Sequence, residues 1–284
     1  MKLFKEISSL RNFLNEKRLN GITKIGFVPT MGALHEGHIS LINASKIQNQ
    51  LTVCSIFVNP TQFNNTDDLA KYPKPIEDDI KLLVETGCDV LFFPEVSEMY
   101  LNDEVKKSVD YGNITNYFEG KFRKGHFDGV VMIVKKFFQI IEADNTYFGQ
   151  KDYQQCMVVE KLIQENNFNI QLHVCPTLRE NDGLAKSSRN VRLTAEEREI
   201  ATIIPNTLYY IKDALQKKPL KEILINARQQ ITAGSNLMKL EYLEIVDAKS
   251  LNPLSEINET THAVALIAAW CGNIRLIDNL ILTE

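Results

Sequence analysis

Two histidines stand three residues apart in the stretch PTMGALHEGHISL, residues 29–41, beside Gly32 and Gly37. Imidazoles at this spacing can ligate a metal, act as an acid/base pair or donate hydrogen bonds to phosphate. Zinc sites generally need three or four protein ligands, and HEGH lacks the H-E-x-x-H spacing that places both rings on one helical face. The sequence therefore favours phosphate binding by His35 and His38, while a loop or capping role without chemistry stays open.

This stretch occupies the place in the chain that a phosphate site needs. Residues 24–28, KIGFV, predict a buried strand, and residues 38–48 predict an amphipathic helix. Ligands of open α/β sheets bind beyond the carboxyl ends of the strands, where the N–H groups and positive dipole end of the next helix attract anions. Glycines at positions 32 and 37 would let the backbone approach such a ligand closely.

Polar residues at other predicted strand ends extend the candidate site. Gln62, in NPTQF, carries an amide that can both donate to and accept from a substrate hydroxyl. Lys151 supplies a point charge for phosphate, and Asp152 an acceptor for a ribose or a cation shell, or a helix cap. Gln62 alone could equally be a solvated polar residue.

Three further segments carry charged or hydroxyl side chains. AKSSRN, residues 185–190, offers hydroxyl and guanidinium donors that could clamp a phosphate. Asp78 and Asp79, in IEDD, point about 100° apart on a helix, so we do not expect an acid/base pair that shares a proton. We expect instead a Mg²⁺ or water role for one of them, or a solvated acidic first turn. Arg123 and His126, in RKGHFDGV, could meet substrate or be structural.

The elements that must position these residues alternate between strand and helix. Leu3, Ile7, Leu10, Phe13 and Leu14 share one helical face at the N-terminus. Further strands are predicted at 51–58, 89–93, 146–149 and 170–175, with helices at 129–142, at 153–167 and from about Ile76 between Pro75 and Gly87. Such alternation predicts a doubly wound parallel sheet, the Rossmann-like α/β class.

The pattern changes after residue 176. Thr194 and Glu197 form a capping-box signature at the start of a helix that Pro205 should interrupt. A second helix is predicted at 219–233, followed by strands at 240–248, 262–270 and 274–282. We therefore expect two domains, a Rossmann-like domain over residues 1–178 and a smaller α+β domain over residues 179–284.

The bulk composition is that of an ordinary globular chain. With a net charge of −4 the chain has no overall excess of basic residues to bind the phosphate backbone of nucleic acid, so nucleic acid is not an expected partner. The N-terminus lacks a signal-peptide pattern, and the longest uncharged apolar stretch, residues 262–274, is shorter than the ~20 residues that a bilayer needs. The five cysteines are scattered without a C-x-x-C pair, which favours a reducing compartment. We expect small-molecule partners, no membrane association and a cytoplasmic location.

PTMGALHEGH resembles the H-x-G-H element of the nucleotidyltransferase superfamily, and its full sequence is similar to that of the corresponding motif in the pantothenate synthetase (pantoate–β-alanine ligase) family. Five more segments match that family in order: FVNPTQF, YPKPIEDD, RKGHFDGV, YFGQKDYQQ and DGLAKSSRN. The resemblance spans residues 25–192. Lys186 stands where the family usually has Met, and Lys124 where it usually has proline.

The resemblance implies an ATP- and Mg²⁺-dependent ligase of pantothenate and coenzyme A biosynthesis, usually a homodimer. It would join pantoate to β-alanine through a pantoyl-adenylate, releasing AMP and pyrophosphate. Residues 1–178 would bind nucleotide and pantoate, and residues 179–284 would act as a lid. The implied nucleotide contacts are Met31, Gly32, Ala33, Leu34, His35, Glu36, Gly37, His38, Gly149, Gln150, Lys151, Asp152, Leu178, Lys186, Ser187, Ser188 and Arg189.

Among these residues the resemblance implies a catalytic set of His35, His38, Lys151, Ser187, Ser188 and Arg189. His38 is the family's usual proton donor, and Gln62 and Gln155 are its pantoate contacts. Two alternatives remain: a nucleotidyltransferase that leaves the nucleotide on its product, and a catalytically silent ATP-binding module. The two glutamines weigh against the first, and the retained phosphate-binding residues weigh against the second.

Overall fold

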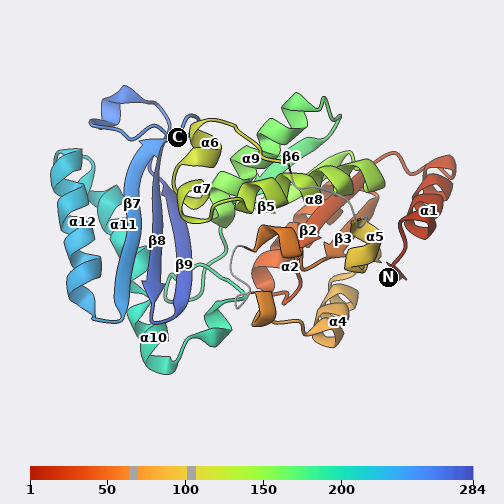
Figure 1. Ribbon diagram of the computed structural model, residues 1–284, viewed down its shortest axis with the longest axis horizontal. Helices are drawn as coiled ribbons and strands as arrows, with labels where there is room; N and C mark the ends of the chain where they lie inside the picture. Colours follow the sequence, from red (N-terminus) through yellow and green to blue (C-terminus); the bar gives the residue numbers. More distant parts are fainter. Residues whose placement is uncertain (64–68, 101–106, 284) are drawn as a thin grey trace. The chain divides into compact units, whose positions relative to one another are not determined.

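A computed structural model describes residues 1–63, 69–100 and 107–283 (Figure 1). The chain divides into two compact units, one of Met1–Gly149 with Gln154–Pro176 and the other of Gln150–Tyr153 with Thr177–Glu284. Nothing in the sequence pattern indicated that Gln150–Tyr153 groups with the second unit. Among the described residues no helix is long and apolar enough to cross a membrane.

The first unit is built on a six-stranded sheet whose strands all run parallel. Its spatial order is β1 (Lys2–Phe4), β4 (Val90–Phe92), β3 (Leu51–Ile56), β2 (Ile25–Thr30), β5 (Asn145–Gly149) and β6 (Gln171–Cys175). This arrangement confirms the predicted doubly wound parallel sheet. Because β2 pairs with both β3 and β5, the strand order reverses there, so ligand-binding segments are expected to follow β2 and β5.

Helices of this unit pack on the sheet through alternating strand residues. Phe27 of β2 contacts Phe137, with ring centroids 5.4 Å apart, whereas Val28 joins a core cluster with Leu41 and Leu83. Those partners belong respectively to α8 (His126–Ile141), α2 (Glu36–Gln48) and α4 (Ile76–Thr86). Other helices described in this unit are α1 (Ile7–Leu19), α5 (Val96–Met99), α6 (Asn113–Asn116), α7 (Glu119–Phe122) and α9 (Tyr153–Glu165), with the 3₁₀ turn η1 (Pro60–Gln62). The 3₁₀ turn η2 (Gln150–Asp152) belongs to the second unit.

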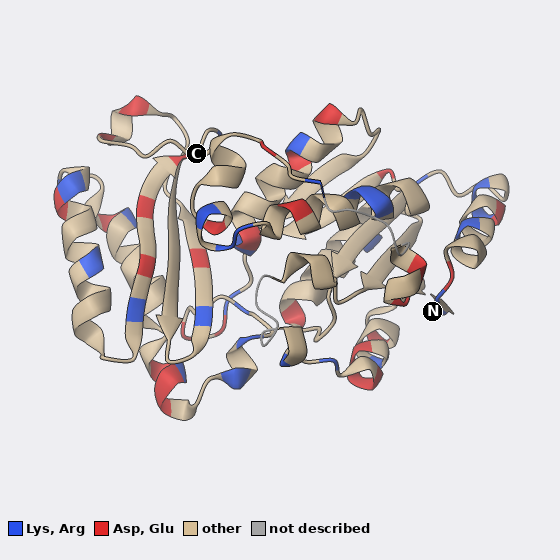
Figure 2. Cartoon of the chain, viewed as in Figure 1, with Lys and Arg blue, Asp and Glu red and all other residues tan. Residues whose placement is uncertain are grey.

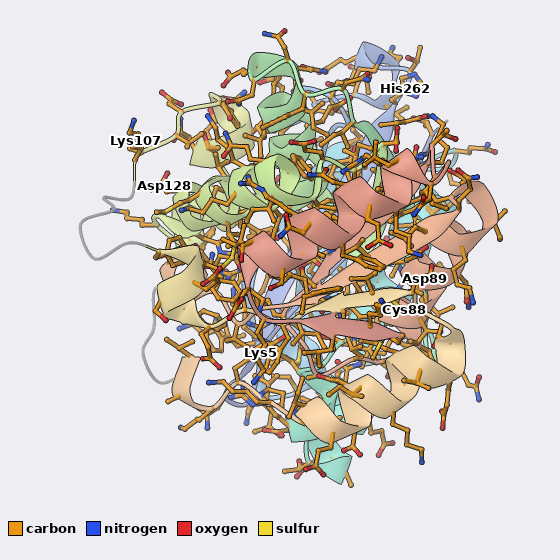
Figure 3. The ribbon with its side chains drawn as sticks, turned by 90° about the vertical axis from the view of Figure 1, so that its right-hand side faces the viewer. Lys5, Cys88, Asp89, Lys107, Asp128 and His262 are labelled. Atoms are coloured by element: carbon orange, nitrogen blue, oxygen red, sulfur yellow. The ribbon has the colours of Figure 1, made fainter. Side chains whose placement is uncertain are left out.

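The starts of two strands are joined by a side chain. Asp89, which lies next to Cys88 just ahead of β4 (Figure 3), accepts a hydrogen bond from the N–H of Thr52 at 2.8 Å. At the N-terminus the structure differs from the prediction, because residues 2–4 form β1 and pair with β4, and the helix begins only at Ile7. The helix expected from Ile76 is confirmed, and Gly87 ends it in the left-handed region with φ +73°.

The second unit packs helices against a three-stranded antiparallel sheet of β7 (Met238–Asp247), β8 (Ala263–Cys271) and β9 (Ile274–Ile281) (Figure 1). Its helices are α10 (Ala195–Ile200), α11 (Ile203–Ala214) and α12 (Leu220–Gly234), with 3₁₀ turns η3 (Asn190–Arg192) and η4 (Ile257–Glu259). The Thr194–Glu197 capping box is present, and the helix is interrupted between Ile200 and Ile203, just before Pro205. Lys and Arg are interspersed with Asp and Glu along α12 and β7 (Figure 2).

Candidate active site

The loop after β2 is shaped by side chains from neighbouring elements. The Thr30 hydroxyl donates to the carbonyl oxygen of Ser55 at 2.7 Å and accepts the N–H of Gly32 at 3.2 Å. Gly32 and Ala33 then take left-handed backbone conformations, with φ +79° and +50°. The N–H groups of Ala33 and Leu34 donate to the two carboxylate oxygens of Asp79, at 2.9 and 2.7 Å.

The two histidines form a reciprocal cap at the start of α2. His35 is the N-cap, and its Nδ1 accepts the N–H of Gly37 at 3.1 Å, while Nδ1 of His38 accepts the N–H of His35 at 3.3 Å. Their ring centroids lie 4.1 Å apart. Because a nitrogen that accepts carries no proton, each neutral ring holds its hydrogen on Nε2. Capping uses only the Nδ1 atoms, so it is compatible with the predicted donation from the Nε2–H groups to phosphate.

Gln62 lies in η1, the turn that follows β3 and Asn59. Its side chain is buried, with 8% exposed, and its backbone carbonyl faces Nδ1 of His126 at 2.9 Å. A carbonyl oxygen can only accept, so His126 carries its proton on Nδ1, the opposite tautomer to the pair in α2. Gly129 brings α8 close as well, since a Cβ there would stand 2.3 Å from the carbonyl oxygen of Thr61. The first turn of α8 thus fixes the backbone that carries Gln62.

The two glutamines at the start of α9 differ in burial. Gln154 is buried and its amide bonds to the backbone of α6 and α7, donating to Ile114 and Tyr117 at 2.7 and 2.8 Å and accepting from Glu119 at 3.0 Å. Gln155, predicted to bind substrate, is half-buried. Arg123 lies near Glu119, with 3.5 Å between Nη1 and Oε2, so α7 gives it a structural partner.

In the second unit, Asn279 of β9 holds the segment that follows β5. Gly149 ends β5, and Gln150, Lys151 and Asp152 form η2. The amide of Asn279 donates to the carbonyl oxygens of Gln150 and Lys151 at 2.9 and 3.0 Å, and its side-chain oxygen accepts from the Gln150 amide at 3.2 Å. The Lys151 Nζ lies 3.9 Å from Oδ1 of Asp152. The backbone from which the Lys151 side chain extends is therefore held by Asn279 at two consecutive carbonyl oxygens.

Asp278 holds the beginning of the loop that carries the predicted serines and arginine, residues 187–189. Arg179 makes a bidentate ion pair with Asp278, at 2.6 and 3.0 Å, and its guanidinium also donates to the carbonyl oxygen of Gly183 at 3.0 Å. Burial raises the pKa of the Asp278 carboxyl, and the hydrogen bonds and charge of Arg179 oppose that rise. Both side chains therefore belong to one buried, paired network.

The loop itself places the remaining predicted nucleotide contacts. Lys186 pairs with Glu180 at 2.9 Å, and the Oγ of Ser187 accepts the N–H of Arg189 at 3.2 Å. Ser188 is half-buried, as are Lys186, Ser187 and Arg189, and Leu178 is exposed. In the first unit Met31 and Gly37 are half-buried, and Glu36 is exposed.

Asp78 and Asp79 do not meet as the ligands of one metal. Asp79 is 2% exposed and both its carboxylate oxygens accept backbone N–H groups, whereas Asp78 is exposed. Within residues 1–63, 69–100 and 107–283, no group of three or more His, Cys, Asp or Glu side chains could hold a metal ion. These donors do not fit a resident Mg²⁺, and Asp79 has a structural partner in the loop.

Several residues that hold individual segments of the predicted site, each within its own unit, could not be identified from the sequence. Asp278 and Asn279 lie in β9, IRLIDNLI, where two consecutive polar residues must face opposite sides of the sheet. That break in alternation is a signal that could have identified one of them as buried. Asn59 precedes Pro60 and accepts the N–H of Thr61, a capping pattern readable from NPT. Gln154 had no signal that distinguished it from Gln155.

The chain is similar to known proteins over its full length. The family described as pantoate–β-alanine ligase matches residues 2–281. The pantothenate synthetase of Cytophaga hutchinsonii is 45% identical over 283 residues, which cover 97% of this chain and 97% of that protein.

Two solved structures extend the comparison to the fold. Pantothenate synthetase from Thermus thermophilus superposes with a TM-score of 0.92 at 36% identity, covering 100% of both chains. Pantoate–β-alanine ligase from Francisella tularensis, complexed with beta-gamma ATP and beta-alanine, has a TM-score of 0.79 at 36% identity and covers 99% of this chain and 98% of that one. The chain therefore belongs to the pantoate–β-alanine ligase family, the pantothenate synthetases, enzymes that condense pantoate with β-alanine using ATP.

Proposed function

We propose that the condensation proceeds through a pantoyl-adenylate. A carboxylate is a poor electrophile until one of its oxygens becomes a good leaving group. In the first step a pantoate carboxylate oxygen attacks the α-phosphorus of ATP, and the bond to the bridging oxygen breaks to release pyrophosphate. In the second step the β-alanine amine attacks the acyl carbon, the bond to AMP breaks, and the nitrogen loses a proton.

The main structural support for this proposal is the pair of histidines, His35 and His38. Adenylation adds no covalent bond to the protein, so positioning and stabilisation of developing phosphate charge must supply the rate. Two Nε2–H donors from rings 4.1 Å apart at a helix start suit that task. We assign both His35 and His38 to the phosphates as neutral donors. A proton-donor role for His38 remains part of the proposal, because the hydrogen on its Nε2 is also the proton that it could transfer.

The second unit supplies cationic and hydroxyl groups for the same chemistry. We assign the Lys151 ammonium to a phosphate of the nucleotide, with η2 held by Asn279. Ser187, Ser188 and Arg189 would contact the departing pyrophosphate through hydroxyl and guanidinium donors. Lys186 is paired with Glu180, so its charge is partly neutralised. The assignment of residues 179–284 to a lid-like domain stays a proposal.

Gln62 and Gln155 are assigned to pantoate. A neutral amide can hydrogen-bond a carboxylate without the ion pairing that would blunt its nucleophilicity. The Francisella tularensis relative was solved in complex with beta-gamma ATP and beta-alanine, which supports ATP and β-alanine as substrates for the present chain. We further propose that ATP enters as its Mg²⁺ complex, with the phosphates as the principal ligands. A homodimer and a cytoplasmic location complete the proposal.

Product analysis tests this function. The enzyme is incubated with ATP, pantoate and β-alanine, and nucleotides and acids are separated by chromatography. We expect AMP, pyrophosphate and pantothenate in equal amounts, with product formation dependent on β-alanine. Formation of ADP in place of AMP would contradict adenylation, and a product that retains the nucleotide would indicate a nucleotidyltransferase.

A further inference from the structure

Asp79 is the side chain that connects α4 to the loop before the histidine pair. Its Oδ2 accepts the N–H of Ala33 at 2.9 Å and its Oδ1 accepts the N–H of Leu34 at 2.7 Å. Gly32 is also in close approach, because a Cβ there would stand 3.0 Å from Oδ2. One carboxylate therefore engages three consecutive residues of the loop.

The loop conformation needs such a partner. Ala33 has a φ of +50°, a left-handed conformation that a residue with a Cβ rarely adopts and that costs free energy. A strained backbone of this kind persists only where its surroundings hold it, and the two hydrogen bonds from Ala33 and Leu34 to a charged acceptor do so. His35 follows directly, so the direction in which α2 starts depends on them.

The helix that carries Asp79 packs into the hydrophobic core. Leu83 of α4 is fully buried in the core cluster that contains Val28 of β2 and Leu41 of α2, and Ile76 and Ile80 pack against it. Asp79 is only 2% exposed. Burial raises the pKa of its carboxyl, against the two backbone hydrogen bonds that lower it, as expected of a carboxylate withdrawn from water.

We propose that Asp79 is a positioning residue for nucleotide binding, fixing residues 31–35 and thereby the histidine pair, and that it is not a metal ligand. The proposal rests on the proposed function for its nucleotide, and on the contacts of Asp79 for its mechanism. It also assigns different roles to two neighbouring carboxylates, since exposed Asp78 makes neither contact with the loop.

Steady-state kinetics separate positioning from metal binding. Asp79→Asn keeps the shape of the side chain but replaces one acceptor oxygen with an amide NH₂ group, which would face a backbone N–H. We expect kcat/KM for ATP to fall about 10- to 100-fold, the equivalent of one hydrogen bond to a charged group. KM for pantoate should stay within about twofold, because Gln62 is held by α8 rather than by α4. The matched control, Asp78→Asn, should retain near-native values for both substrates.

A Mg²⁺ titration supplies the opposing outcome. If Asp79 were a metal ligand, its replacement would raise the Mg²⁺ concentration needed for half-maximal rate, and excess Mg²⁺ would restore the activity of Asp79→Asn. Positioning predicts an unchanged Mg²⁺ dependence and no recovery. Recovery by Mg²⁺, or an equal loss in Asp78→Asn, would overturn the proposal.

Amide hydrogen exchange tests the contacts without activity. In the unmodified enzyme without ATP or Mg²⁺, the amides of Ala33 and Leu34 should exchange slowly, and in Asp79→Asn exchange across residues 31–38 should accelerate while β6 is unchanged. Exchange of the two amides at unprotected rates in the unmodified enzyme would refute the proposal even if the variant does not fold. Should the enzyme form no pantothenate, the proposed function fails, yet this measurement still decides whether Asp79 holds the loop.

Discussion

The side-chain amide of Asn279 donates a hydrogen bond to the backbone carbonyl oxygen of Lys151 at 3.0 Å. Asn279 is 1% exposed, and the residue before it, Asp278, holds Arg179 in a bidentate ion pair. Two consecutive residues of β9 therefore hold two segments, η2 and the loop after Arg179, that are both assigned to the nucleotide. Neither contact could be inferred from the spacing of the sequence motifs.

Replacing Asn279 should impair catalysis through Lys151. Asn279→Ala removes the donor to two carbonyl oxygens and should lower kcat/KM for ATP by up to about 30-fold, since each of the two hydrogen bonds contributes roughly 1 kcal/mol. The exposed Asn258 of the same unit provides the control, and Asn258→Ala should leave the kinetics unchanged. An Asn279→Ala enzyme with native kinetics would show that η2 keeps its position without this residue.

The tautomer of His126 predicts a selective rescue at the Gln62 site. His126→Ala removes the donor to the Gln62 carbonyl oxygen and should raise KM for pantoate severalfold, whereas His126→Asn offers an amide donor near Nδ1 and should recover part of that loss. KM for ATP should change little in either variant. Equal KM values for pantoate in the Ala and Asn variants would argue against the hydrogen bond as the cause.

The α2 histidines should act through Nε2. In His38→Gln the amide nitrogen reaches approximately the position of Nε2, whereas in His38→Asn it does not, so the Gln variant should release pyrophosphate faster. His38→Ala should lose about 2.7–4 kcal/mol of transition-state stabilisation, and Lys151→Ala should also lower the rate of pyrophosphate release far more than folding stability.

Nitrogen-15 NMR of the free enzyme should report Nε2–H tautomers for His35 and His38; Nδ1–H signals would contradict the reciprocal cap.

Acid stability should depend on Asp247. Burial alone would raise the pKa of this carboxyl, but hydrogen bonds from Thr260 and Ser250 and the backbone N–H of Lys249 lower it from 3.8 to about 2. The unfolded state therefore binds more protons between these values, so the contribution of Asp247 is complete above about pH 4 and is lost as the pH falls toward 2.

Urea unfolding at pH 5, 4 and 3 measures this contribution. Asp247→Asn should lower the free energy of unfolding at pH 5, and its difference from the unmodified protein should shrink as the pH falls. Asp213, which is exposed on α11, supplies the control Asp213→Asn. A difference between Asp247→Asn and the unmodified protein that does not vary with pH would indicate that the carboxylate charge is not involved.

Local patterns predicted most of the fold. The apolar run at residues 51–58 and the proline and glycine around α4 gave elements within a few residues of those observed, because these signals act within one element. The strand β1 was missed, since residues 2–4 are extended only by pairing with β4, nearly ninety positions later. The start of α2 was placed two residues late because a histidine N-cap lacks the usual Ser, Thr, Asp or Asn signature.

The site was predicted as a set of residue types rather than as a set of contacts. The sequence identified His35 and His38, but only the geometry indicates which nitrogen caps the helix. It placed Asp78 and Asp79 on different sides of a helix, without showing that Asp79 is buried against a loop some forty-five positions earlier. Contacts of this range depend on how elements pack, which periodicity and motif spacing do not encode.

Isotope transfer tests the adenylation mechanism most directly. The enzyme is supplied with ATP, β-alanine and pantoate whose carboxylate carries oxygen-18, and the AMP formed is analysed by mass spectrometry. Attack of the carboxylate on the α-phosphorus, followed by cleavage of the acyl–oxygen bond, predicts that each AMP gains one oxygen-18 atom. AMP without the label, formed alongside pantothenate, would contradict a pantoyl-adenylate and with it the role assigned to the histidine pair.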